Sequence, residues 1–114
     1  MTVDEYKKLK PGKRNKYGNT KTDGYDSVRE RDRHAELLLL QKAGAISDLE
    51  RQVKFVLIAK SQYGQELRYV ADFTYFESGR LVVEDVKSEP TKTPLYRWKK
   101  RMMAERYGIL IRET

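Results

Sequence analysis

The chain has 114 residues, of which 39% are hydrophobic and 36% charged, and its 24 lysines and arginines outnumber its 17 acidic residues. A chain of this length forms one domain with a single modest core, and its net charge of +7 favours a polyanionic partner. The absence of cysteine excludes disulfides, thiolate zinc sites and cysteine nucleophiles. No apolar run is long enough for a signal core or a membrane span, so we expect an intracellular, cytoplasmic protein without a membrane anchor.

Basic residues concentrate at the N-terminus, where residues 1–21 hold seven of them against two acids. We expect residues 1–20 to form a flexible basic arm and residues 21–114 to form the folded domain. Such an arm can be a solvated extension, a segment that contacts phosphates, or both, because basic arms often become ordered when they bind nucleic acid. The candidates for phosphate contact in the arm are Lys13, Arg14 and Lys16.

The first predicted element is a helix over about residues 28–43. Ser27 and Glu30 have the spacing of a capping box, and Gly44 is a stop signal. Glu30 lies on the helix face that should cover the sheet, so it points inward, either as a cap partner of Ser27 or as a metal ligand. The apolar residues that define this face are Leu37, Leu38 and Leu40.

Three strands follow, over residues 51–59, 67–76 and 80–87, because each segment is rich in β-branched and aromatic residues. They can form an antiparallel meander. Thr93 and Pro94 then supply the N-cap and first turn of a second helix, which Gly108 ends, and residues 109–111 offer a short last strand. This order predicts a mixed α/β domain with a central sheet flanked by helices, in which the last strand pairs in an undetermined direction.

The two middle strands place charged residues together. A two-residue turn at Ser78 and Gly79 would put Asp72 directly opposite Asp85, with Lys87 two residues further on the same side of the sheet. Carboxylates about 5 Å apart repel by roughly 3 kcal/mol at an effective dielectric of 20. A divalent cation with hard oxygen ligands, Mg²⁺ or Mn²⁺, would offset this. Alternatively, Lys87 neutralises one acid, or the strand ends at Asp85 and the rest lies in water.

These residues carry a resemblance. Glu30 early on a helix, Asp72 in YVADF, and Asp85 with Lys87 in VVEDVK resemble the PD-(D/E)XK nuclease superfamily, which has the restriction-endonuclease-like fold. Over residues 17–111 the chain is more closely similar to a small phage-associated family of that superfamily, whose outline is similar to Holliday junction resolvases and phage endonucleases that cut branched DNA. Ala71 departs from the Pro of the superfamily's name, and Asp85 fills a position that often holds Glu.

The resemblance implies a Mg²⁺-dependent endodeoxyribonuclease, with Mn²⁺ as a substitute. Asp72, Asp85 and the carbonyl of Val86 would hold the cation, Glu30 would bind a second ion or orient its water, and Lys87 would position or deprotonate the attacking water. The implied substrate is branched DNA in phage recombination or processing inside a bacterial host, since so small a chain has little room for base reading. Symmetric cutting of a junction needs two active sites, so we expect a homodimer.

Several other residues have two interpretations each. Gln52 lies near the metal site or at a strand edge, and His34 is a structural histidine or a base. Glu84, the competing acid, should lie on the face of the sheet opposite to Lys87. On the second helix we expect an inward stripe of Leu95, Trp98 and Met102 that belongs to the core rather than to a base-stacking platform. The charged residues left for phosphates, or for a solvated face, are Arg97, Lys99, Lys100 and Arg101.

Two hypotheses compete with the nuclease. One is a nucleic-acid-binding accessory module that has the same fold and performs no chemistry. The other is a metal-free structural protein, for which replacing Asp72 or Asp85 by Asn would raise thermal stability and change nothing else.

Overall fold

The computed structural model describes residues 27–88 and 91–114, so the predicted basic arm, with Lys13, Arg14 and Lys16, lies outside the described residues. In chain order the elements are α2 (Val28–Lys42), β1 (Ser47–Ile58), β2 (Leu67–Glu77), β3 (Arg80–Asp85), α3 (Pro94–Tyr107) and β4 (Arg112–Glu113). The sheet has the order β1-β2-β3-β4, with β1, β2 and β3 antiparallel and β4 parallel to β3. The predicted mixed α/β class and antiparallel meander are therefore confirmed.

The helix ends follow the predicted signals. Ser27 caps α2, and its hydroxyl accepts a hydrogen bond of 3.0 Å from the Glu30 amide. Thr93 caps α3 in the same way through the Tyr96 amide at 3.1 Å, and Gly108 ends α3 in the left-handed region with a φ of 67°. Each capping hydroxyl satisfies one of the orphan amides of a first helical turn, which fixes where the helix begins.

The hairpin between β2 and β3 has the predicted register. Ser78 and Gly79 both have positive φ, 53° and 77°, as a tight hairpin turn requires, and Glu77 pairs with Arg80. The pairing continues as far as Phe73 opposite Glu84, and β3 ends one residue later at Asp85. The predicted strand over residues 80–87 is therefore two residues too long.

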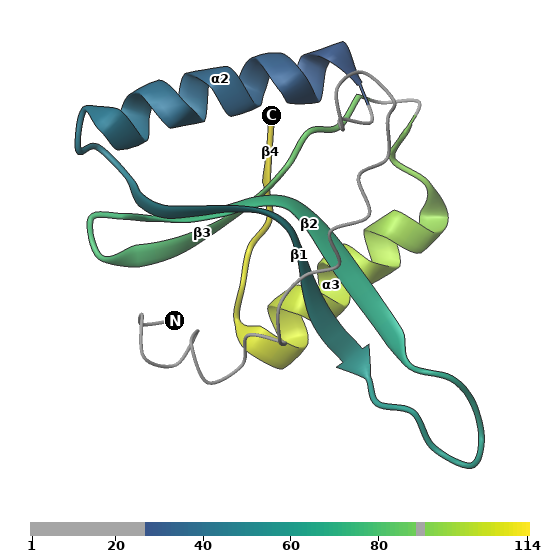
Figure 1. The fold of residues 1–114 in the computed structure, drawn as a ribbon. Helices are drawn as coiled ribbons and strands as arrows, with labels where there is room; N and C mark the ends of the chain where they lie inside the picture. The colour runs from purple at the N-terminus through teal and green to yellow at the C-terminus, as the bar shows by residue number, and fades with distance from the viewer. Residues whose placement is uncertain (1–26, 89–90) are drawn as a thin grey trace.

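Two hydrophobic cores lie on opposite sides of the sheet, one beneath α2 and one against α3 (Figure 1). On β2, Ala71 belongs to the α3 core while Phe73, two residues later, belongs to the α2 core. Regular alternation would put both on one face, so the side-chain alternation is interrupted at Asp72. On β1, Gln52 has a φ of 53° at the matching position, between the pairs Arg51–Phe73 and Val53–Ala71. The strands bend here.

The predicted inward faces of both helices are partly wrong. Of the three predicted leucines of α2, Leu37 is buried whereas Leu38 and Leu40 are exposed, because one row of side chains meets the curved sheet. On α3, Leu95 and Trp98 are exposed at 55% and 67%. The inward row of α3 consists instead of Tyr96 and Met103, which are seven residues apart and so share a face. Met102 is partly buried against this core.

The last strand is displaced from its predicted position. Residues 109–111 lead out of α3, and their two isoleucines, Ile109 and Ile111, are buried in the α3 core. The strand itself is β4, which pairs Arg112 with Glu84 and Glu113 with Asp85. This parallel pairing brings the last residues of the chain beside the end of β3. No helix of residues 27–88 and 91–114 has the length and hydropathy of a membrane-spanning segment.

The buried and exposed side chains of α3 should contribute differently to stability. Met103→Ala should lower the free energy of unfolding by about 3 kcal/mol, because it leaves a cavity in the α3 core. Leu95→Ala, at an exposed position of the same helix, should change it by about 0.5 kcal/mol or less. Urea denaturation followed by circular dichroism measures both, and equal losses would contradict the orientation of α3.

Candidate functional site

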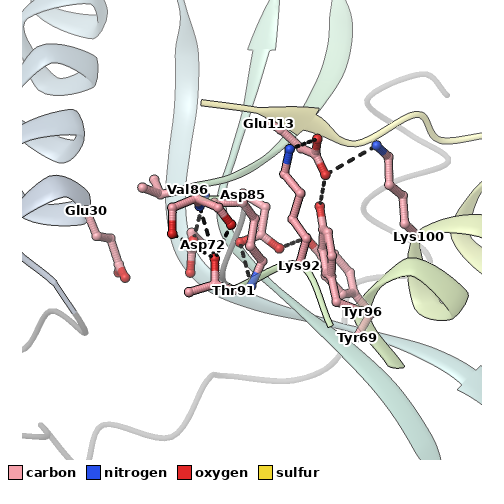
Figure 2. A network of polar contacts seen from close by, with 12 residues as sticks. Glu30, Tyr69, Asp72, Asp85, Val86, Thr91, Lys92, Tyr96, Lys100 and Glu113 are labelled. Atoms are coloured by element: carbon pink, nitrogen blue, oxygen red, sulfur yellow. Dashed lines mark hydrogen bonds and ion pairs between the residues drawn. The ribbon is translucent and has the colours of Figure 1, made fainter. Parts of the chain in front are cut away.

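The candidate site is a pair of acids at the open end of the β2–β3 hairpin. Asp72 follows the interrupted alternation in β2, and Asp85 is the last residue of β3 (Figure 2). Both residues directly follow the Phe73–Glu84 pair toward the open end of the hairpin, one on each strand, and each carboxyl group acts on the other. Asp72 accepts a hydrogen bond of 2.8 Å from the Val86 amide, and Asp85 accepts one of 2.6 Å from the Tyr69 hydroxyl. The structure therefore brings the two acids together as the register predicted.

The position of Asp72 follows from the local backbone. The last β2–β3 pair is Phe73 with Glu84, and the amide of Val86, the first residue after β3, bonds to the Asp72 side chain instead of to a strand carbonyl. The Asp72 carboxyl group thus takes the place of a backbone carbonyl in the hydrogen bonding between the two strands, at the point where the strands bend apart. This contact also means that Val86, whose carbonyl is a predicted metal ligand, is fixed next to the acid pair.

The two acids cannot both carry a full charge without cost. Burial, followed by the hydrogen bond and the charge of Asp85, raises the pKa of Asp72 to about 8, although the Val86 amide and Lys87 act in the opposite direction. A like charge at short range and a low dielectric both favour the neutral form of a carboxyl group. At neutral pH the acid pair therefore favours holding one proton, unless a cation takes its place.

Lys87 lies beside the pair, as predicted. Its ammonium nitrogen is 3.7 Å from Oδ1 of Asp85 and 4.5 Å above the centre of the Tyr96 ring. Its backbone amide donates to the carbonyl of Thr114 at 3.1 Å, which holds the segment after β3 alongside the C-terminal strand. The side chain is held between an acid and an aromatic face, and its charge points at the acid pair.

Glu30 points inward from α2, as predicted, and is only 2% exposed. Its carboxylate accepts from Gln52 at 3.2 Å and lies 3.5 Å from the Arg51 guanidinium. Figure 2 draws no contact between Glu30 and the acid pair. In residues 27–88 and 91–114 no group of three or more acidic, histidine or cysteine side chains is arranged to hold a metal ion. Glu30 is thus near the site but is not joined to Asp72 and Asp85.

Gln52 has a specific part in this arrangement. A left-handed conformation costs a residue other than glycine on the order of 1 kcal/mol, so it persists only where its surroundings require it. Here the strained residue both bends β1 and directs its amide at Glu30. This favours the interpretation of Gln52 as part of the site over that of an ordinary strand edge.

Ser27 and His34 have local partners. Ser27 is the N-cap of α2. The His34 ring stacks on Phe73 with 5.5 Å between ring centres, and burial together with the charge of Arg51 lowers its pKa. The structure therefore places His34 against the α2 core rather than against the acid pair, which favours a structural histidine.

Glu84, the neighbour of Asp85, lies on the opposite face of the sheet, as predicted. It accepts two hydrogen bonds from Arg33 of α2, at 2.7 and 3.0 Å, one from the Tyr75 hydroxyl at 2.7 Å and one from Thr114 at 3.1 Å. These donors outweigh its burial and lower the pKa of Glu84. A fully buried, fully bonded carboxylate of this kind ties α2 to the sheet.

Three residues of the site were not predicted from the sequence. They are Tyr69, which bonds Asp85, Tyr96, which lies under Lys87, and Glu113, which bonds the Tyr96 hydroxyl at 2.7 Å. The spacing of Tyr96 and Met103 on one helix face could have indicated that Tyr96 points inward. No sequence signal could have found Glu113, because its position depends on the register of a two-residue parallel strand.

The predicted basic residues of α3 are divided by the structure. Arg97 and Arg101 are exposed, and Lys99 is half-buried. Lys100 is different, because its ammonium lies 3.2 Å from the Glu113 carboxylate. The structure thus joins Lys100 to the surroundings of the acid pair and leaves Arg97 and Arg101 at the surface.

The donor set fits a hard divalent cation. Asp72 and Asp85 offer neighbouring carboxylate oxygens, and the raised pKa of Asp72 reflects its burial and its closeness to Asp85, both of which a cation between the two acids would offset. The chain has no cysteine, and His34 stacks on Phe73 away from the acid pair, so oxygen-preferring ions suit the site better than softer metals.

The fold and the site define a small mixed α/β domain that holds a buried acidic pair and a lysine at the end of its central hairpin. Residues 13–112 match the family described as "Protein of unknown function (DUF1064)", and the chain belongs to this family. Comparison with curated proteins finds no match, and comparison with solved structures finds none either.

The acid pair should make stability depend on pH. Below pH 4 Asp72 is protonated in both the folded and unfolded states, whereas between about pH 4 and its folded pKa of about 8 only the unfolded state ionises. Stability therefore falls as the pH rises through this window. Asp72→Asn should raise the free energy of unfolding by about 2 kcal/mol at pH 8 and leave it nearly unchanged at pH 4. Urea denaturation at both pH values tests this, and equal differences would contradict it.

Substitutions on the opposite face of the sheet, at the Arg33–Glu84 pair, should lower stability. Arg33→Met leaves the Glu84 carboxylate buried without its cationic partner, so it should lower the free energy of unfolding by about 3 kcal/mol. The double variant Arg33→Met with Glu84→Met removes both charges and should recover most of that loss. A single variant as stable as the wild-type protein in thermal denaturation would show that the pair does not hold α2 on the sheet.

Proposed function

We propose that this protein is a metal-dependent DNA endonuclease with a restriction-endonuclease-like fold, which hydrolyses phosphodiester bonds. The observation that carries the proposal is the contact between Asp72 and Asp85, with the Lys87 ammonium 3.7 Å from Asp85. A structural role alone gives no reason to bury two acids side by side, because their repulsion destabilises the fold. The resemblance to PD-(D/E)XK nucleases assigns these same residues.

Asp72, Asp85 and the carbonyl of Val86 would hold Mg²⁺ or Mn²⁺, which supplies a Lewis acid for the phosphoryl oxygen and lowers the pKa of a bound water. Lys87 steadies the negative charge that develops on the phosphate, because its ammonium is fixed between Asp85 and the Tyr96 ring. Glu30, anchored by Gln52, orients water on the α2 side of the site. No covalent intermediate with the protein is needed.

The proposed substrate is branched DNA. The net charge of +7 favours a polyanion, and a domain of 114 residues has little surface for reading bases. Symmetric cutting of a junction needs two active sites, so we propose a homodimer. We propose that the protein acts inside a bacterial host, in phage DNA recombination or processing.

A binding module without catalysis is the second candidate, and one observation favours it. Both acids already have partners within the protein, since Asp72 accepts from the Val86 amide and Asp85 from the Tyr69 hydroxyl. Such contacts would suffice to hold a protonated acid pair without any cation. The module would bind DNA through its basic surface and leave it intact.

A cleavage assay separates the two candidates. Purified protein is incubated with four-way junction, flap, linear duplex and single-stranded DNA in the presence of Mg²⁺, Mn²⁺ or EDTA. We expect products only with the metals and with branched DNA preferred. Lys87→Met and Asp85→Asn should each reduce the rate by about 100-fold or more, because each removes a group that acts on the reacting phosphate or its water.

Matched controls are available on the surface. Lys60→Met removes an exposed lysine, and Asp32→Asn removes an exposed acid of α2, so both should cleave at the wild-type rate. Shifted bands without products under every condition would overturn the nuclease and support the binding module. A loss of activity in Lys60→Met as large as that in Lys87→Met would show that net charge, not the site, controls the rate.

A further inference from the structure

The outer face of α3 carries Leu95, Arg97, Trp98 and Arg101. Trp98 is the one tryptophan of the chain and is 67% exposed, whereas Tyr96 of the same helix is buried. An α-helix turns by about 200° over two residues, so Trp98 points away from the core that Tyr96 packs into. Leu95, three residues before Trp98, is also exposed. The outer face of α3 therefore presents an aromatic and apolar strip that neither hydrophobic core of the described residues includes.

Arginines flank this strip. Arg97 and Arg101 are exposed and four residues apart, so they stand one turn apart on the helix, and Arg101 is three residues beyond Trp98. Two like charges at this spacing repel each other. Over its whole length α3 has one acid, Glu105, and five basic residues, Arg97, Lys99, Lys100, Arg101 and Arg106. The outer face of α3 is thus both aromatic and cationic.

The charge of the outer face determines which partner fits it. A second copy of the chain in a two-fold contact would bring the same arginines against each other, and their repulsion opposes that association. A nucleic acid strand suits both kinds of side chain, since its phosphates pair with guanidinium groups and the flat face of a base stacks on an indole ring. The net charge of +7 acts in the same direction. The outer face of α3 therefore fits a polyanion that also carries aromatic rings.

Trp98 needs a base whose flat face is open. In a duplex each base is covered on both sides by its neighbours, whereas single strands, flaps and the branch point of a junction expose bases. Aromatic side chains set among cationic ones are the arrangement by which proteins bind such strands without reading their sequence. We propose that the outer face of α3 binds unpaired DNA, with a base stacked on Trp98 and the adjoining phosphates on Arg97 and Arg101. This surface rests on the proposed nuclease function only in taking the nucleic acid to be DNA.

The stacked base lies across α3 from the acid pair. Tyr96 faces inward, with the Lys87 ammonium 4.5 Å above the centre of its ring, whereas Trp98 faces outward. A helix with its side chains is about 10–12 Å across, so a base on Trp98 and a phosphate at the acid pair belong to different nucleotides. Trp98 therefore selects the structure of the DNA and takes no part in hydrolysis. In the proposed function this contact gives branched DNA its preference over linear duplex.

The fluorescence of Trp98 tests the contact directly, because no other tryptophan contributes to the signal. The full-length protein in EDTA is titrated with a short single strand of thymidines, which forms no internal pairs, and with a linear duplex of the same length. We expect the single strand to remove about half of the fluorescence or more, because stacking places the indole ring against a base. The duplex should cause much less quenching. Binding of the single strand without quenching would overturn the proposal.

A substitution series tests the contribution of the ring to affinity, measured by anisotropy of fluorescein-labelled DNA in EDTA. Trp98→Ala should weaken binding of the single strand about 10-fold or more and change duplex binding by about 2-fold or less, because only an unpaired base stacks on the ring. Trp98→Phe keeps an aromatic ring and should recover most of the affinity. The control Tyr63→Ala removes an aromatic residue that is 89% exposed in the loop after β1, and it should bind like the wild type. Equal losses in Trp98→Ala and Tyr63→Ala would contradict a specific role of the outer face.

The arginines and the alternative partner have their own measurements. Arg97→Met and Arg101→Met should each lower the slope of log affinity against log salt by about 0.7 for the single strand, because each removes one phosphate contact. The control Lys60→Met should leave the slope unchanged. Sedimentation velocity tests a second copy as the occupant. If Trp98→Ala converts a dimer to a monomer and binds the single strand like the wild type, the outer face joins two copies, and the DNA surface is overturned.

The failure of this proposal is distinguishable from that of the nuclease. Quenching by the single strand, without cleavage of any DNA in Mg²⁺ or Mn²⁺, would overturn the nuclease and support the DNA surface. Metal-dependent cleavage by Trp98→Ala with the wild-type preference for branched DNA would support the nuclease and overturn the DNA surface.

Discussion

Two buried carboxylates meet at the end of the central hairpin, and the surrounding structure has to offset their repulsion. Two unit charges 4 Å apart would repel each other by about 4 kcal/mol at an effective dielectric of 20. The raised pKa of Asp72, about 8, favours its neutral form and so reduces the repulsion. The Val86 amide, the Tyr69 hydroxyl and the Lys87 ammonium stabilise the negative charge that remains. These partners come from β2 and from the segment that follows β3, so the site depends on the pairing of these two strands.

Neighbouring acids in β3 have opposite surroundings because strand side chains alternate. Glu84 faces α2 and is saturated by Arg33, Tyr75 and Thr114, whereas Asp85 faces the α3 side and meets a second acid. The first arrangement holds a helix on the sheet, and the second holds a charge that the fold alone does not need. Both acids are buried, so their hydrogen bonding, rather than their burial, distinguishes the structural acid Glu84 from the candidate catalytic acid Asp85.

The bend in β1 and β2 determines what can reach the acid pair. The bend interrupts the alternation of side chains in β2 at Asp72. On β1 it turns the Gln52 side chain toward Glu30, so the same irregular region positions residues on two strands. On the other side β4 adds Glu113 with its two lysines. The acid pair thus lies between Glu30 on the side of α2 and Glu113 on the side of α3.

Much of this architecture could be predicted from local rules. The caps at Ser27 and Thr93, the Gly79 turn and the alternation of β3 act over a few residues, and together they predicted the helices, the hairpin register and the meeting of Asp72 with Asp85. The inward direction of Glu30 followed from the helical period in the same way. Trp98 shows the limit, because a helix carries several rows of side chains and only the packed sheet selects the buried one.

What the sequence by itself determined is therefore the order of the elements, the hairpin register and the pairing of the two acids, since these depend on turn chemistry and strand period. Tertiary structure alone decided that Glu113, at the far end of the chain, stands in register with Asp85, that Arg33 saturates Glu84, and that Tyr96 rather than Trp98 faces the site. The physical reason is that these contacts join segments whose relative placement is fixed only when both cores pack against the bent sheet.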